Sequence, residues 1–233
     1  MKAIILAGGK GTRLAEYTSK IPKPMVNINN KPIITYIIDH YIKFGVTEII
    51  IAGGYKYHLL KNYFVLNKKK YPNVRVLDTG LNSLTGKRIL KLKKNFKKGE
   101  NFFMTYGDGV ADVDITKLLK HHKKNKKICT LTAVRPIARF GELKIRGNTV
   151  YSFNEKPQLK QGWINGGFFV FNYKIFEFIN KKNQMFEREP MQKLLKKKNV
   201  NSFKHSGFWM CMDTLRDKIL LEKIIIQNLK KNI

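Results

Sequence analysis

Two kinds of periodicity alternate along the first half of the chain. Short apolar runs, rich in β-branched and aromatic residues, predict buried strands at residues 2–6, 48–52, 74–77 and 102–105. Apolar positions at helical spacing predict helices between them, at residues 32–44, 56–66 and 114–124. Strands and helices that alternate at this length predict an α/β fold, Rossmann-like, with a mixed, mostly parallel sheet and helices on both faces.

The second half of the chain has shorter elements. Strands are expected at residues 130–134, 142–145, 150–153 and 167–171, and helices at residues 174–179, 190–197 and 214–229. No internal repeat, linker or low-complexity tail interrupts the sequence. We therefore expect one domain over residues 1–233, with a nucleotide-binding half at about 1–127 and a half at about 128–233 that adds a second pocket.

Composition narrows the class of protein. Of the 233 residues, 43% are hydrophobic, which is enough for one sizeable core and too many for a disordered chain. No stretch approaches the ~18 consecutive apolar residues of a membrane span, and the apolar run after Lys2 is too short for a signal peptide. Cys129 and Cys211 lie far apart without a Cys-x-x-Cys motif. We therefore expect reduced thiols, a cytoplasmic protein and no membrane insertion.

A formal charge of +30 raises the question of a polyanionic partner. Eight of the 46 basic residues are arginines, and the richness in Lys, Asn and Ile is what an A+T-rich genome produces. The lysine runs at residues 68–70, 123–127 and 196–198 lie at the ends of predicted helices, where cations suit the helix dipole. This pattern favours solvated surfaces over a polyanion-binding surface, so no nucleic-acid partner is expected.

A glycine-rich loop follows the first predicted strand directly. Gly8, Gly9 and Gly11 carry no Cβ, so backbone N–H groups can approach an anion closely. Thr12 adds a hydroxyl and Arg13 a forked cation that suits phosphate oxygens. The spacing is neither GxxxxGK[ST] nor GxGxxG, and a tight turn without a ligand is the alternative interpretation.

A lysine held between two prolines follows this loop. Pro22 and Pro24 fix the backbone on either side of Lys23, an arrangement that a solvated loop lysine does not need. Together, residues 6–25 resemble the signature of the sugar-phosphate nucleotidyltransferases, LAGGxGTRLxxxTxxxPKPM, with Thr18 at the matching position. The resemblance continues through residues 78–80, 83–88, 105–112, 138–143, 155–157, 163–170, 186–190 and 207–218.

These segments are most similar to the family members that use CTP and glucose 1-phosphate. The chain departs from those members between residues 64 and 71, where they usually carry an insertion. The resemblance implies the nucleotide-diphospho-sugar transferase fold, Mg²⁺ as cofactor and a homo-oligomer. It implies that a sugar-phosphate oxygen attacks the α-phosphorus of CTP, and that CDP-glucose and pyrophosphate form. The product would feed deoxysugars of surface polysaccharide such as the O antigen of lipopolysaccharide.

Catalysis would then rest on positioning and charge neutralisation, because the nucleophile is already an anion. The resemblance implies that Asp108 and Asp213 bind Mg²⁺, that Lys23 contacts the α-phosphate and that Arg13 holds the leaving phosphates. Asp108 follows a predicted strand between two glycines, where an α/β sheet places ligands, although a turn Asp has the same pattern. Asp213 precedes a predicted helix, so a helix N-cap is the alternative interpretation.

Substrate contacts follow from the same resemblance. Arg13, Lys23 and Asp108 are the expected catalytic residues. The expected nucleotide contacts are Leu6, Ala7, Gly8, Gly9, Lys10, Gly11, Thr12, Arg13, Lys23, Ser83, Arg88 and Gly107. The expected sugar-phosphate contacts are Glu155, Lys156 and Asn165, with Arg139 and Gly141 as weaker candidates. From the residues alone, a surface ion pair and a turn Asn are the alternatives for Glu155–Lys156 and Asn165.

Two other functions stay open at this stage. A transferase of the same fold would use another triphosphate or sugar, as a guanylyltransferase of a heptose or mannose phosphate does. An inactive polyanion-binding module would be expected to have lost phosphate or metal positions, and the sequence retains Arg13, Lys23, Asp108 and Asp213.

Overall fold

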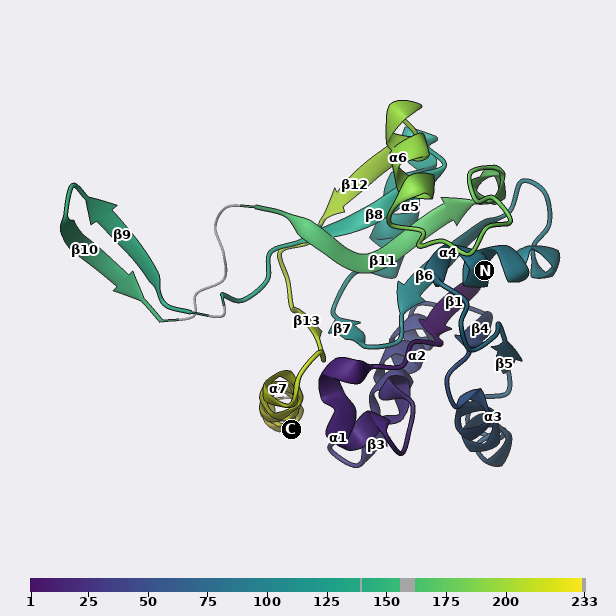
Figure 1. Ribbon diagram of the computed structural model, residues 1–233, viewed down its shortest axis with the longest axis horizontal. Coiled ribbons are helices and arrows are strands. Elements are labelled where there is room, and N and C mark those ends of the chain that lie inside the picture. The colour runs from purple at the N-terminus through teal and green to yellow at the C-terminus, as the bar shows by residue number, and fades with distance from the viewer. Residues whose placement is uncertain (139, 156–161, 232–233) are drawn as a thin grey trace.

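A seven-stranded sheet forms the centre of the molecule in the computed structural model, which describes residues 1–138, 140–155 and 162–231 (Figure 1). The strand order is β12-β8-β11-β6-β1-β4-β5. The strands are β1 (Lys2–Ala7), β4 (Glu48–Gly53), β5 (Val74–Asp78), β6 (Asn101–Tyr106), β8 (Cys129–Val134), β11 (Ile164–Asn172) and β12 (Val200–Lys204). β11 runs antiparallel to both of its neighbours, while the other adjacent pairs are parallel. The predicted mixed, mostly parallel sheet is confirmed.

Side chains of each strand alternate between two cores, one on each face of the sheet. In β1, Ala3 and Ile5 belong to one buried cluster and Ile4 and Leu6 to the other. The first cluster takes residues from α2 (Ile33–Lys43), α3 (Tyr57–Leu66) and α5 (Ile115–Asn125). The second takes residues from α4 (Thr85–Lys91), α6 (Glu189–Lys196) and the 3-10 helix η4 (Tyr173–Glu177). Helices therefore cover both faces, as predicted.

A third buried cluster joins the beginning of the chain to its end. It holds Leu14 and Val26 from the N-terminal segment together with Met210, Met212 and Leu221 from the C-terminal segment. The elements in these two segments are the short η1 (Thr12–Leu14), α1 (Ala15–Thr18), η2 (Lys23–Met25), β2 (Asn27–Ile28), β3 (Lys31–Pro32) and β13 (Trp209–Cys211), and the 17-residue helix α7 (Leu215–Lys231). This packing holds the glycine-rich loop and the start of α7 on one side of the molecule.

A hairpin projects from the body on the left of Figure 1. It consists of β9 (Glu142–Arg146) and β10 (Thr149–Asn154), paired antiparallel. Both strands were predicted from the sequence, at residues 142–145 and 150–153. The projection was not expected, because alternation predicts one buried face and here Phe153 is 64% exposed.

Several short elements differ from the expectation. The predicted helix at residues 174–179 is the 3-10 helix η4, and β7 (Gly109–Ala111), α4, β12, β13 and η3 (Lys93–Asn95) were not predicted. β12 and β13 have mixed polar and apolar residues, so their pairing with β8 and β7 decides their structure. The division of the chain into two halves of one domain stays a prediction. In the described part of the chain, no helix is long and apolar enough to cross a membrane.

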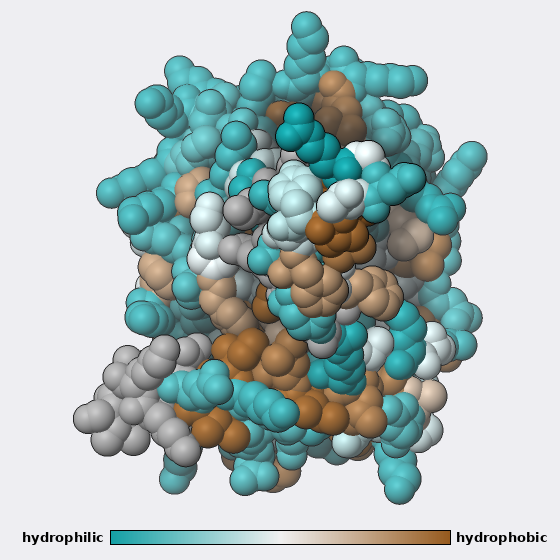
Figure 2. All heavy atoms as spheres, turned by 90° about the vertical axis from the view of Figure 1, so that its left-hand side faces the viewer, coloured by the Kyte–Doolittle hydropathy of each residue, from teal (hydrophilic) through white to brown (hydrophobic). Residues whose placement is uncertain are grey.

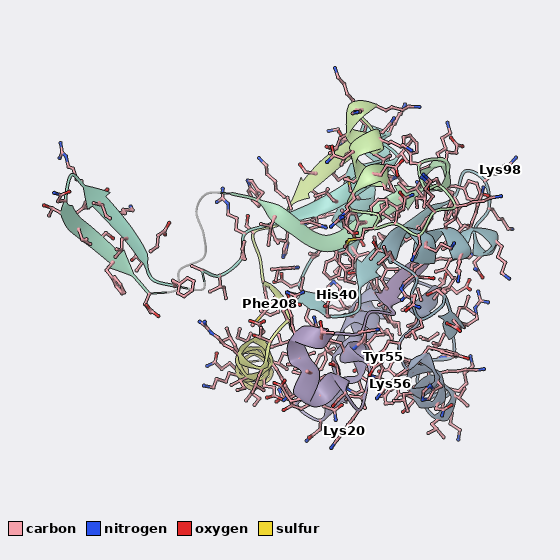
Figure 3. All side chains as sticks on the ribbon, in the orientation of Figure 1. Lys20, His40, Tyr55, Lys56, Lys98 and Phe208 are labelled. Carbon is pink, nitrogen blue, oxygen red and sulfur yellow. The ribbon has the colours of Figure 1, made fainter. Side chains whose placement is uncertain are left out.

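Many lysines are exposed at separate parts of the surface. Figure 3 shows Lys20 and Lys98 extending from well-separated parts of the body. The run 123–127 ends α5, and Lys126 itself forms the left-handed C-cap, with φ of 50°. These positions fit solvated helix ends.

Candidate active site

A two-stranded ribbon brings two carboxylates together from distant parts of the sequence. β7 begins one residue after Asp108, β13 ends two residues before Asp213, and the two strands pair antiparallel with Cys211 opposite Gly109. The backbone N–H of Met212 donates to the carbonyl of Asp108 at 2.9 Å. At the far end of the ribbon, the N–H of Asp112 donates to the carbonyl of Phe208 at 3.1 Å. Figure 3 labels Phe208 above α7. The ribbon therefore fixes the spacing of the two acidic side chains.

Lys23 lies between these carboxylates. Its Nζ donates to Asp108 Oδ2 and to Asp213 Oδ1, at 2.6 Å each. The two acceptor oxygens therefore lie within about 5 Å of each other. Arg13 adds a second cation, donating from Nη1 to Asp213 Oδ2 at 2.8 Å. The predicted metal and phosphate residues thus form one cluster with two negative and two positive charges.

The charges of the cluster shift the pKa values of Lys23, Asp213 and the adjacent Cys211. Burial opposes the charge on Lys23, but the carboxylates of Asp108 and Asp213 outweigh it and raise the lysine pKa above its ordinary value. Burial also opposes the charge on Asp213, yet Lys23 and Arg13 lower its pKa. Burial, with the negative charges of Asp213 and Asp108, raises the pKa of the Cys211 thiol to about 12. Lys23 and Asp213 are therefore both charged at neutral pH, and the Cys211 thiol is protonated.

Asp213 does not cap the helix that follows it. Thr214 and Asp217 perform that role, since the Thr214 N–H donates to Asp217 Oδ2 at 2.9 Å and the Asp217 N–H donates to Thr214 Oγ1 at 3.3 Å. The side chain of Asp213 is therefore available to the charged cluster, and the N-cap alternative is wrong.

The glycine-rich loop packs directly against the lysine segment. Gly11 has φ of +67°, and a Cβ at this position would lie 2.9 Å from the Cβ of Lys23 and from Thr18 Cγ2. The Thr18 hydroxyl donates to the Gly11 carbonyl at 3.0 Å. Gly107 is equally close, because its Cβ would lie 3.0 Å from Pro24 Cγ. Gly11 is required by its left-handed φ and by contact with the segment that carries Lys23, and Gly107 is packed tightly against the same segment.

Arg88 lies beneath the loop and is 4% exposed. A Cβ on Gly8 would lie 2.1 Å from the guanidinium. Burial lowers the arginine pKa from its ordinary value. The guanidinium donates, over 2.6–3.2 Å, to the carbonyls of Gly8, Gly53, Gly80 and Leu81 and to the hydroxyl of Thr79. Arg88 therefore ties the glycine-rich loop to the ends of β4 and β5.

A cavity of about 300 Å³ lies in front of these residues. Ten of the twelve expected nucleotide residues line it, namely Leu6, Ala7, Gly8, Gly9, Gly11, Arg13, Lys23, Ser83, Arg88 and Gly107. Lys10 and Thr12 are exposed and are not among its lining residues. Asp108 lines the same cavity, so the charged cluster opens into it.

Sequence reasoning missed two polar residues of this wall. Thr85 Oγ1 donates to Glu187 Oε2 at 2.6 Å, and the Tyr106 hydroxyl donates to Glu187 Oε1. Thr85 and Tyr106 line the cavity. Burial, together with the charge of Glu187, raises the pKa of Tyr106. Tyr106 directly follows the predicted strand at residues 102–105 and precedes Gly107, and Thr85 precedes Gly86; these positions were the signal that could have found them.

Of the expected sugar-phosphate residues, Glu155 and Asn165 are not among the lining residues of this cavity. Glu155 follows β10 on the projecting hairpin, 3.2 Å from where a Cβ of Gly141 would lie. Asn165 is at the start of β11, where its Oδ1 accepts from the Gly167 N–H at 2.9 Å. Lys156 and Arg139 lie outside the described residues. The sugar-phosphate roles of Glu155, Lys156 and Asn165 therefore stay predictions.

A second, larger cavity of about 610 Å³ adjoins Asp213. Its walls come from the stem of the hairpin, from β13 and from α7, and most of its lining residues are apolar. Figure 2, which views the molecule from the side of the hairpin, shows hydrophobic surface gathered in the lower part of this face. Asp213 and Arg216 are polar groups at its edge.

The chemistry of the charged cluster fits a magnesium ion. Among the described residues, no group of three or more His, Cys, Asp or Glu side chains has the arrangement of a metal cage. Asp108 and Asp213 supply carboxylate oxygens close together, and both face the cavity system. Mg²⁺ is typically bound by one or two carboxylates, with water and phosphate oxygens completing its shell.

Comparisons with known proteins give the relatives of this chain. A profile of the family described as nucleotidyl transferase matches residues 2–218. The chain is 44% identical over 243 aligned positions to the glucose-1-phosphate cytidylyltransferase of Salmonella typhimurium, covering 95% of both chains. It is 36% identical to the D-glycero-alpha-D-manno-heptose 1-phosphate guanylyltransferase of Campylobacter jejuni, covering 76% of this chain and 78% of the relative. The crystal structure of HddC from Yersinia pseudotuberculosis superposes with a TM-score of 0.76, at 24% identity, covering 96% and 99% of the two chains.

Proposed function

Because the chain belongs to the nucleotidyl transferase family, we propose that it transfers the cytidylyl group of CTP to α-D-glucose 1-phosphate. The products are CDP-glucose and pyrophosphate. The observation that carries this proposal is the charged cluster at the nucleotide-type cavity, in which Lys23 lies 2.6 Å from both Asp108 and Asp213.

Electrostatics defines what the site has to do. A sugar phosphate and a triphosphate repel each other, so their approach requires cations at the point of contact. Lys23 and Arg13 supply two cations beside the glycine-rich loop, and the α-phosphate binds next to Lys23. The sugar-phosphate oxygen is already an anion, so attack on the α-phosphorus requires no general base, and the bond to pyrophosphate breaks in line. Arg13, Lys23 and Asp108 are the residues to which we assign the chemistry.

The two carboxylates are suitable ligands for magnesium as the cofactor. Asp108 and Asp213 would hold it, and when bound it would supply charge neutralisation at the phosphates. The surrounding structure positions the carboxylates and the lysine. The ribbon of β7 and β13 fixes the two carboxylates, and the close contact of Gly11 and Gly107 with residues 23–24 fixes the lysine.

The nucleotide lies along the glycine-rich loop in this proposal. Backbone groups of residues 6–12 wrap the base and phosphates, with Arg88 beneath this loop and Ser83 at another part of the cavity wall. Arg88 donates to the Gly8 carbonyl and so holds the glycine-rich loop, whereas the Ser83 hydroxyl donates to the Thr79 carbonyl and holds the segment after β5. Glu155, Lys156 and Asn165 contact the sugar phosphate. The hairpin that carries Glu155 would have to approach the cavity, from the same chain or from another copy.

Choice of base and sugar rests on similarity along the chain. The relative named for cytidylyl transfer to glucose 1-phosphate is 44% identical over 95% of both chains, whereas the guanylyltransferase of Campylobacter jejuni is 36% identical over 76% of this chain. This difference favours CTP and glucose 1-phosphate over GTP and a heptose phosphate.

A pyrophosphate-release screen tests the proposal. The protein is incubated with each of the four nucleoside triphosphates and with glucose, mannose or heptose 1-phosphate, in Mg²⁺ and in excess chelator. We expect the highest kcat/KM with CTP and glucose 1-phosphate, and release that stops with the chelator. A preference for GTP or UTP would overturn the assignment of the base. No pyrophosphate release with any pair of substrates would overturn the proposal that the protein is an active nucleotidyltransferase.

We propose further that the protein is a homo-oligomer held by the projecting hairpin. Leu143 pairs with Phe153 and Ile145 pairs with Val150, so the four side chains share one face, and each is 47–64% exposed. The opposite face carries polar residues such as Lys144, which pairs with Ser152. A two-stranded hairpin is marginal alone, and an exposed apolar face marks an interaction surface. A second copy is a suitable occupant, because its apolar cavity beside α7 provides a matching surface.

Light scattering after gel filtration tests this assembly. Ile145→Ser combined with Phe153→Ser should reduce the mass to that of one chain, while Lys144→Ser on the polar face should leave it unchanged. A monomeric wild-type protein, or a double variant of wild-type mass, would contradict the hairpin interface.

Two assignments about the protein's surroundings complete the proposal. We place the enzyme in the cytoplasm, where Cys129 and Cys211 would stay reduced as they are in the structure. We assign its product to the supply of deoxysugars for surface polysaccharide, because the relative it resembles over 95% of its length is a glucose-1-phosphate cytidylyltransferase. Detection of CDP-glucose and of the deoxysugars derived from it in the cytoplasmic fraction of cells that express the chain, with the loss of both in Asp108→Asn, tests these assignments.

A further inference from the structure

The ammonium of Lys23 occupies the position between the two carboxylates that would hold the metal. Nζ lies 2.6 Å from Asp108 Oδ2 and 2.6 Å from Asp213 Oδ1, and the lysine side chain is 10% exposed. A magnesium ion binds its oxygens at about 2.0–2.1 Å. A cation that approached the same two oxygens would lie against the ammonium, so the two cannot share the place.

Charge balance points the same way. Asp108 and Asp213 contribute two negative charges, and Lys23 and Arg13 contribute two positive ones, all within hydrogen-bonding distance. A divalent cation alone would leave this partly buried cluster with an excess of two positive charges, which is costly in a low-dielectric site. A triphosphate that arrived with the cation would restore the balance.

The backbone around Lys23 lets the ammonium move while its stem stays fixed. Pro22 and Pro24 constrain the chain on either side, and the lysine Cβ is in close contact with Gly11. Lys23 lines the cavity of about 300 Å³, so rotation about its side-chain bonds can turn the ammonium from the carboxylates toward a ligand there without a backbone change.

We propose that Lys23 acts as an internal cation that blocks the metal position in the free enzyme and is released by the triphosphate. In the free protein it neutralises Asp108 and Asp213. When the phosphates bind, the ammonium turns to them and leaves the carboxylates to the divalent cation. The second part of this inference rests on the proposed function, whereas the block in the free protein does not. The enzyme therefore binds its metal together with the nucleotide and only weakly before it.

Titration with Mn²⁺ in the absence of nucleotide tests the block, with free Mn²⁺ measured by electron paramagnetic resonance. Lys23→Met keeps the length of the side chain and removes its charge. We expect this variant to bind one Mn²⁺ at least tenfold more tightly than the wild type. A gain of affinity is the opposite of what loss of an ordinary active-site side chain produces. Lys20→Met, an exposed lysine on the same segment, should bind as the wild type does.

A double variant and a second substitution keep the test decisive. Lys23→Met with Asp213→Asn should lose the gained Mn²⁺ site, which assigns it to this cluster. Lys23→Gln replaces Lys23→Met if the latter does not unfold cooperatively. Equal or weaker Mn²⁺ binding in a folded Lys23 variant would overturn the proposal. Because no nucleotide is present, this result is independent of the pyrophosphate-release screen, whose failure would overturn the function alone.

Discussion

The backbone N–H of Met212 donates to the carbonyl of Asp108 at 2.9 Å, which joins two segments that lie almost half the chain apart. One residue after Met212, Asp213 contacts the same lysine as Asp108. The acidic pair therefore depends on the short ribbon of β7 and β13. The site forms only when the C-terminal segment has packed onto the N-terminal one.

Removal of the charge on Lys23 should affect the chemical step more than nucleotide binding. In Lys23→Ala we expect kcat to fall by about 100-fold or more, the usual effect of losing one preorganised charge in a transition state. The KM for CTP should change less than tenfold. Steady-state kinetics with saturating glucose 1-phosphate checks this split. If KM alone rose, Lys23 would be a binding residue rather than a transition-state one.

The contact of Gly11 with the lysine segment should make it intolerant of a side chain. Gly11→Ala introduces a Cβ with φ of +67° and at 2.9 Å from Lys23 Cβ. The left-handed conformation alone costs about 1–2 kcal/mol of unfolding free energy. Gly9→Ala is the matched control, because nothing lies within 4 Å of its Cβ position. Urea unfolding should show a lower midpoint for Gly11→Ala than for Gly9→Ala, and equal midpoints would contradict the contact.

Acid should destabilise the protein through His122. This ring is 2% exposed and bonds to the Thr130 hydroxyl at 2.9 Å. Burial, followed by the nearby His121, lowers its pKa from 6.5 to about 4. The unfolded state then binds more protons between these values, so stability should be lost as the pH falls from about 6.5 to about 4. The loss is on the order of 3 kcal/mol, at 1.36 kcal/mol for each pH unit.

Chemical denaturation at several pH values measures this loss. His122→Gln removes the titrating ring and should flatten the curve of unfolding free energy between pH 6.5 and 4. His58→Gln at an exposed position should keep the slope of the wild type. An unchanged slope in His122→Gln would assign the acid sensitivity to other groups.

The sequence predicted the core better than it predicted the short elements. Strands such as β1, β4 and β6 are continuous apolar runs. Such a run is buried on both faces only when the strand lies inside a sheet that is covered on both sides, so its structure could be predicted. β13 spans three residues and has no pattern of its own, so pairing with β7 determines it. A helix over 174–179 was predicted from apolar spacing, but the segment closes as a 3-10 helix directly after β11.

The candidate site was predictable where a motif fixes the backbone. Lys23 between two prolines and the glycine-rich loop lie where the motif placed them, beside one cavity. The depth of Arg88 was not predictable, because its carbonyl partners come from three separate loops. The projection of the hairpin carrying Glu155 was not predictable either, since alternation of residues does not say which surface covers the apolar face.

The central claim is that Asp108 and Asp213 act on one cation, and a double-mutant cycle measures this most directly. Pyrophosphate release from CTP and glucose 1-phosphate is compared for Asp108→Asn, Asp213→Asn and the double variant, each confirmed to be folded by circular dichroism. We predict that each single variant loses most of its turnover, at least about 100-fold. The double variant should lose little more, because the shared ion is already lost. Losses that multiply in the double variant, or near-normal turnover in Asp108→Asn, would contradict the account.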